Sequence, residues 1–144
     1  MDDIQRFEQL IKGGNCCISI VTLEEQYALE TVRQVALGLE GGMLIWSVAG
    51  GVKDGLLADS LFIGDTETPA AGLVHFSSAK PGTFCVTLDL AEHLQTELAL
   101  RALRDLIEHF EKNGCTLIMI DSKDNLPEVI KSYTRRFEIS FPDD

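Results

Sequence analysis

Five apolar runs alternate with segments of helical period along the chain, and this alternation limits the fold more than any other feature. The runs are CCISIVT at 16–22, MLIWSV at 43–48, GTFCVTLDL at 82–90, CTLIMID at 115–121 and RRFEISF at 135–141. Near-continuous apolar strands separated by helices are typical of a parallel sheet that is covered on both faces. The sequence therefore predicts a doubly wound α/β fold, a three-layer α/β/α sandwich around a central, mostly parallel sheet of five strands.

The segments between these runs carry recognisable helix signals. Residues 22–42 open with Thr22 and have Glu25 three positions later, which predicts a capping box at the start of a helix. Thr68 followed by Pro69 predicts an N-cap and a first helical residue. Residues 91–114 have the pattern of one long helix, and 2–14 and 125–133 predict shorter ones. The stretch SLFIGD at 60–65 is compatible with either a short strand or a loop.

Length and charge limit the classes of function. The 144 residues suggest a single domain spanning 1–144. Twelve Lys and Arg residues against 23 Asp and Glu residues give a net charge of −11, which argues against a general nucleic-acid binder and against docking on anionic membranes. The polar N-terminus is unlike a signal peptide, and no apolar run approaches the roughly 18 residues of a membrane-spanning helix. We therefore expect a soluble cytoplasmic protein.

All four cysteines lie in or beside the apolar runs, and none has metal-ligand spacing; they are Cys16, Cys17, Cys85 and Cys115. We expect reduced, buried thiols that pack as small apolar side chains.

The chemistry of a phosphate-binding loop is missing from the expected position. Such a loop needs a Gly-Lys dipeptide between the first strand and its helix, and the sequence contains no Gly-Lys dipeptide. Glu24 and Glu25 occupy this junction instead, so carboxylates stand where the helix N-terminus would otherwise attract an anion. The stretch SVAGGVKDGL at 47–56 follows the second strand, and its spacing from Gly50-Gly51 to Lys53 is too short for a phosphate cradle. We interpret it as a turn in which glycine permits positive φ, or as a partner-contacting loop.

Aspartates at the ends of two predicted strands leave a residual nucleotide site open as an alternative. Asp89 ends the third strand, and Asp121 with Ser122 ends the fourth. The carboxyl ends of parallel strands share one edge, where these residues could face a ligand together with Lys53. Capping and turn formation explain the same residues equally well. Leu90 also follows Asp89, at the position where a nucleotide hydrolase usually needs an acid to orient water.

A phospho-receiver domain is a third alternative. Its acidic pair would be Glu24 and Glu25, its phosphoacceptor Asp89 and its hydroxyl Ser122. The lysine that such a domain needs after its fifth strand is missing, which weighs against this hypothesis.

Several short motifs occur in an order that is shared with a known family. They are IVTLEEQYALETVRQVA, LIWSVAGGVKDGL, FCVTLDLAEHL, LRALRDL, LPEVI and FEISFPDD. Together they resemble the N-terminal domain of a group of bacterial and plastid AAA+ ATPases, a degenerate NTPase-like domain that precedes the true ATPase module. The family often has Lys-Asp-Phe-His where this chain has Leu88-Asp89-Leu90-Ala91, so a role of the family's residues at that site does not carry over.

The resemblance has consequences for fold and cofactors. It implies the strand order 5-1-4-3-2, and it implies that an ATPase module follows the terminal FPDD. ATP and Mg²⁺ are then expected only in that module. For this domain the expectation is no catalytic residue, no metal and no cofactor.

The leading hypothesis is a non-catalytic accessory domain that helps an AAA+ module assemble or contact its target. The loops at 49–57 and 122–125 are expected to lie near one another at the carboxyl edge of the sheet and to offer a contact surface. The candidate contact residues are Gly50, Gly51, Lys53, Asp54, Arg135 and Arg136. Replacing Lys53 and Asp54 with alanine is expected to leave stability nearly unchanged. The expected partner is the ATPase module or another protein, and a homo-oligomer is compatible with this role.

Overall fold

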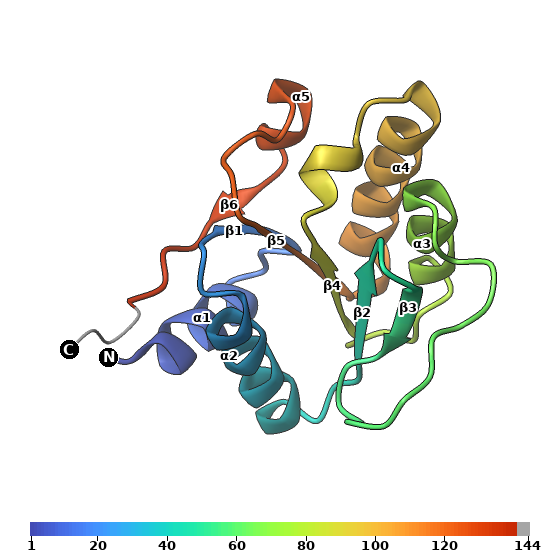
Figure 1. The fold of residues 1–144 in the computed structure, drawn as a ribbon. Coiled ribbons are helices and arrows are strands. Elements are labelled where there is room, and N and C mark those ends of the chain that lie inside the picture. Colours follow the sequence, from blue (N-terminus) through green and yellow to red (C-terminus); the bar gives the residue numbers. More distant parts are fainter. Residues whose placement is uncertain (141–144) are drawn as a thin grey trace.

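The computed structural model describes residues 1–140 and contains one mixed sheet of six strands in the order β3-β2-β4-β5-β1-β6 (Figure 1). The predicted strands correspond to β1 (Cys17–Val21), β2 (Met43–Ser47), β4 (Phe84–Leu88), β5 (Thr116–Asp121) and β6 (Arg135–Arg136). These five run parallel to one another. Their order is the predicted 5-1-4-3-2, so both the fold class and the strand order are confirmed.

The sixth strand, β3 (Gly51–Asp54), was not expected. It pairs antiparallel with β2 and lies within the stretch 47–56, for which the sequence predicts a turn or loop. Gly51 adopts a φ of 98° at the start of β3, as expected of a glycine in a tight hairpin. SLFIGD forms no strand, and its Ile63 N–H donates to the Val52 carbonyl at 2.7 Å. This segment therefore covers the outer edge of β3, which would otherwise present unpaired backbone groups.

Helices cover both faces of the sheet (Figure 1). On one face, α1 (Asp3–Lys12) and α2 (Glu25–Gly38) bury an apolar cluster that includes Phe7, Ile20 and Val32. On the other, α3 (Pro69–Phe76), the 3₁₀ turn η1 (Leu90–His93), α4 (Glu97–Asn113) and α5 (Glu128–Lys131) contribute to the second cluster. Alternate residues of the central strands supply the two clusters, as the pleat of a fully buried sheet requires.

Two of the predicted helix starts are wrong and one is confirmed. The Thr68 hydroxyl caps α3 by accepting from the Ala71 N–H at 3.2 Å, with Pro69 at the first position. The capping box at Thr22 does not form, because α2 begins at Glu25 and Glu24 makes no side-chain cap. The expected long helix is split: η1 ends at His93, and Thr96 caps a separate α4.

The last predicted strand is shorter than its apolar pattern indicated. Only Arg135 and Arg136 pair with β1, after which the Phe137 N–H donates to the Ser19 carbonyl at 2.9 Å. The terminal FPDD motif lies outside the described residues. Cys17, Cys85 and Cys115 are buried, Cys16 is half-buried, and all four are free thiols, as predicted. Among residues 1–140, no helix has the length and apolar character needed to cross a membrane.

Candidate functional site

Two aspartates and a serine meet at the carboxyl edge of the sheet, where β4 and β5 end side by side. Asp89 follows β4 and adopts a left-handed backbone with a φ of 55°. Its Oδ1 accepts hydrogen bonds from the Ser122 backbone N–H at 2.9 Å and from the Ser122 hydroxyl at 3.0 Å. The structure therefore brings Asp89 and Ser122 together, but it uses them to tie η1 to the end of β5.

Asp121 is almost completely buried, with 2% of its surface exposed. Its Oδ1 accepts from the Ala91 N–H at 3.0 Å, and its Oδ2 has no hydrogen-bond partner among the described residues. Burial raises the pKa of Asp121 to about 6; the Ala91 hydrogen bond opposes this, and the charges of Asp89 and Glu92 add to it. Asp89 and Asp121 thus form a reciprocal link between η1 and β5.

The start of α2 adds another carboxylate to this edge. Glu25 lies half-buried in the first helical turn, and burial together with the charge of Asp89 raises its pKa. Lys123 forms an ion pair with Glu92 of η1, with 3.9 Å between its Nζ and Oε1 of Glu92. An anionic phosphate at this junction would meet carboxylates instead of a glycine-rich cradle. Within residues 1–140, no three potential ligands from His, Cys, Asp and Glu are grouped so that they could hold a metal ion.

Lys53 does not join Asp89 and Asp121. Because β3 runs antiparallel, Lys53 lies opposite Ile45 in the middle of β2, and its Nζ is 5.2 Å from the centroid of the Phe62 ring. Strand β2 also separates β3 from β4. Of the loop expected at 49–57, residues 51–54 form β3 and run away from this edge, and only the hairpin turn reaches the same edge as Asp89.

The remaining hairpin candidates have structural roles. Asp54 Oδ1 accepts from the backbone N–H groups of Leu56 and Leu57, at 2.7 and 3.2 Å. A Cβ on Gly50 would lie 2.5 Å from the Phe62 ring. These contacts fix the loop after β3, and the loop forms one wall of a cleft of about 460 Å³ against α2.

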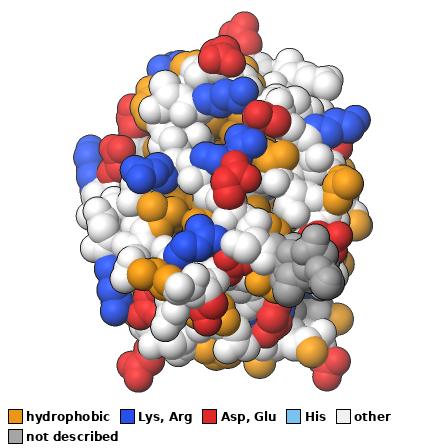
Figure 2. Space-filling view, turned by 90° about the vertical axis from the view of Figure 1, so that its left-hand side faces the viewer, with side chains coloured by type: hydrophobic (Ala, Val, Ile, Leu, Met, Phe, Trp, Pro, Cys, Tyr) orange, Lys and Arg blue, Asp and Glu red, His pale blue; other side chains and the backbone are white. Residues whose placement is uncertain are grey.

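Arg135 and Arg136 lie at the opposite edge of the sheet and are exposed. Arg136 pairs with Asp124 at 3.5 Å and with Glu138 at 3.2 Å. On the side of the molecule that Figure 2 shows, basic side chains are interspersed with acidic ones. The two arginines are therefore accessible for contact with a partner, on a surface of mixed charge.

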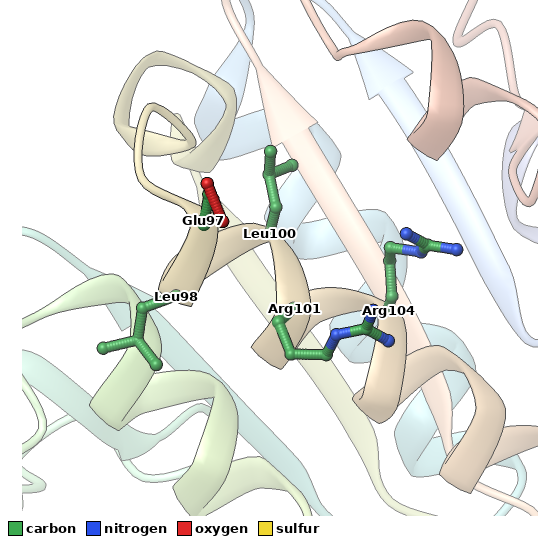
Figure 3. Close-up of a pocket in the computed structure, with 5 residues that line it drawn as sticks. All are labelled: Glu97, Leu98, Leu100, Arg101 and Arg104. Atoms are coloured by element: carbon green, nitrogen blue, oxygen red, sulfur yellow. The ribbon is translucent and has the colours of Figure 1, made fainter.

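Sequence reasoning missed two surfaces. One is the loop after β3, where Leu57, Leu61, Phe62 and Ile63 are exposed. The other is a hollow of about 550 Å³ along α4, lined by two leucines, two arginines and Glu97 (Figure 3). The ambiguous pattern of SLFIGD concealed the first, and nothing in the helical pattern of residues 91–114 indicated the second.

A family model described as the N-terminal domain of SpoVK-like AAA ATPases matches residues 3–139. A search of curated proteins finds no match to the chain.

Proposed function

Because the chain belongs to the family of N-terminal domains of SpoVK-like AAA ATPases, we propose that it is a non-catalytic accessory domain that contacts its ATPase module or the target of that module. In this role the domain supplies surfaces that bind another protein or module. The separate ATPase module binds ATP and Mg²⁺ and carries out the nucleotide chemistry. A cytoplasmic location, where ATP is available, is part of the proposal.

One observation carries the proposal: the strand-to-helix junction has the wrong chemistry for a phosphate. Glu25, Asp89 and Asp121 surround the place where a P-loop NTPase holds phosphate, and the bonded oxygens of the two aspartates serve the backbone of η1 and β5. Like charges in a partly buried site repel an anion, and hydrogen bonds already made internally have to be broken before a ligand can use them.

The residual nucleotide site finds less support in this arrangement. That hypothesis needs Lys53 beside Asp89, Asp121 and Ser122, and Lys53 lies on another strand beyond β2. The receiver hypothesis needs a free phosphoacceptor, and one oxygen of Asp89 already accepts two hydrogen bonds from Ser122.

The proposal is tested by measuring association between this chain and the AAA ATPase module of its parent protein. We expect Lys53→Ala, or Arg135→Ala with Arg136→Ala, to weaken association by about tenfold, because each is a cation on an acidic domain; Lys53 is half-buried and the two arginines are exposed. Lys112→Ala, at the exposed end of α4, is the control and is expected to leave association unchanged. Association that is absent for wild type, or equal for all variants, argues against the proposed contacts.

Asp54 is unsuitable for this comparison, which corrects the expectation from the sequence. Its carboxylate accepts two backbone hydrogen bonds, from Leu56 and Leu57, so Asp54→Ala should cost about 1 kcal/mol of stability. Lys53→Ala should stay within about 0.5 kcal/mol of wild type. Thermal unfolding of the two single variants distinguishes these outcomes.

A further inference from the structure

The loop after β3 displays large apolar side chains to solvent. Leu57 is 64% exposed and Leu61 is 86% exposed, and Phe62 and Ile63 are exposed beside them. We call residues 57–63 the apolar loop. Soluble proteins seldom gather several large apolar side chains on one exposed segment unless that segment meets a partner.

Hydrogen bonds hold the apolar loop in place. The Ile63 N–H donates to the Val52 carbonyl at 2.7 Å, and the Ser60 hydroxyl donates to the Asp54 carbonyl at 2.8 Å. Thr66 is buried and links the loop to β3, since its hydroxyl donates to Ile63 and accepts from Val52. The loop therefore presents its side chains on an ordered backbone, which reduces the entropy lost on binding.

Charge around the apolar loop is mostly acidic, with Lys53 as a cation beside it, 5.2 Å from the centroid of the Phe62 ring. Asp59 lies within it, and Asp65 and Glu67 follow it, all three exposed. Two such loops facing each other would bring like charges together, and an anionic membrane would repel the same carboxylates. A complementary surface must combine apolar side chains with cations.

Helix α4 carries such a surface on this same chain. The hollow in Figure 3 is lined by residues of the first two turns of α4. They are Glu97, Leu98, Leu100, Arg101 and Arg104. Leu98 is 70% exposed. Arg101 forms one exposed ion pair with Asp105, and Arg104 forms no ion pair within the described residues.

We propose that the apolar loop of one copy docks into the α4 hollow of a second copy. Leucine side chains would then meet Leu61 and Phe62, while the acids of the loop would lie near Arg101 and Arg104. The contact is heterologous, since two different surfaces meet, and repetition of such a contact builds rings or filaments. The inference rests on the proposed accessory role, because this contact would be the means by which the domain promotes assembly.

Sedimentation of the isolated chain and of charge-swapped variants tests this contact. The salt concentration is about 150 mM, because the Debye length is then about 8 Å and the repulsion between two negative domains is largely screened. We expect the average mass of wild type to rise with concentration. Asp59→Lys with Asp65→Lys should abolish association, and so should Arg101→Glu with Arg104→Glu. Mixing the two double variants, or combining all four substitutions in one chain, should restore association, because unlike charges again face each other.

A wild type that stays monomeric up to about 1 mM overturns the inference. Association that survives either double variant, or that mixing fails to restore, overturns it as well. Thermal unfolding confirms that each variant folds. Failure here is distinguishable from failure of the accessory role, which depends on association with the ATPase module in a separate measurement.

Discussion

Asp121 is a carboxylate at the buried end of β5, with a hydrogen bond from Ala91 to one oxygen and none among residues 1–140 to the other. Burial of a charge without full compensation is unfavourable, and the carboxylate of Asp89 nearby adds repulsion. Asp89 itself has a left-handed backbone and accepts two hydrogen bonds from Ser122. The hydrogen bonds of these two aspartates fix η1 to the end of β5, whereas a working nucleotide site needs acids that are available to a ligand.

Stability should therefore fall as pH rises through the titration of Asp121. The native pKa of about 6 lies above the ordinary 3.8, so the native state holds the proton more tightly than the unfolded state does. The contribution is fully present below about pH 4, is lost between about pH 4 and 6, and amounts to about 3 kcal/mol.

Asp121→Asn should remove this fall in stability while keeping an acceptor for the Ala91 N–H. Urea unfolding of wild type and Asp121→Asn between pH 4 and 8 measures the difference. Glu108→Gln, an exposed change on α4, should keep the profile of wild type. Equal slopes for wild type and Asp121→Asn would show that Asp121 is not the titrating group.

At the scale of elements, helix α3 packs closely on the hairpin through a glycine. A Cβ on Gly72 would lie 2.3 Å from Cδ1 of Trp46 and 2.6 Å from its Nε1. That indole N–H donates to the Thr66 carbonyl at 2.9 Å, so the same ring also anchors the segment after the apolar loop. Gly72 therefore sets the distance between α3 and β2.

Gly72→Ala and Gly38→Ala should have opposite effects, although both glycines are helical. An extra methyl at Gly72 collides with a buried ring and should cost about 1–3 kcal/mol. Gly38 has open space around its Cβ position, so alanine should add up to about 1 kcal/mol through helix propensity. Denaturant unfolding of both variants measures the signs; destabilisation of both, or of neither, would contradict the packing described.

The sequence predicts elements well where one pattern dominates, and less well where tertiary contacts decide. The four long apolar runs all form buried strands, because continuous apolar residues fit a sheet covered on both faces. Strand β3 was missed because its glycine and charges suggest a turn, and pairing with β2 overrides that preference. Thr96 splits the long helix by capping α4, a signal present in the sequence but masked by helical periodicity on both sides.

The candidate site was harder to predict than the fold. The position of Asp89 beside Ser122 follows from parallel strands, but the path of β3 decides where Lys53 goes. A hairpin turned back along β2 cannot be distinguished from an open loop by composition alone. The exposure of Leu61 likewise depends on how the loop is held by Thr66.

At the scale of the whole molecule, the segment after β6 is fastened to the first helix, so that the two ends of the described chain lie close together (Figure 1). Asp3 accepts from Arg6, from the Tyr27 hydroxyl at 2.9 Å, and from the Ser140 N–H at 2.8 Å and hydroxyl at 3.0 Å. Burial alone would raise the pKa of Asp3, but these hydrogen bonds outweigh it and hold the pKa below its usual value.

Asp3→Ala should free this segment without unfolding the sheet. We expect faster deuterium exchange of the Ser140 N–H, because its acceptor is lost, while the amides of β5 keep their protection. In wild type the stabilisation by Asp3 is present above about pH 4 and is lost as pH falls through its lowered pKa. Glu8→Ala, elsewhere on α1, is the control. Unchanged exchange at Ser140 would contradict the anchoring role.

The central claim is that this domain supplies surfaces and leaves nucleotide chemistry to another module. Calorimetric titration of the isolated chain with Mg-ATP tests this, because carboxylates line the strand-to-helix junction at which a P-loop NTPase holds phosphate. We expect no saturable binding at micromolar concentrations of nucleotide and no ATP hydrolysis. A micromolar Kd, or ATP turnover that Asp89→Ala abolishes, would contradict it.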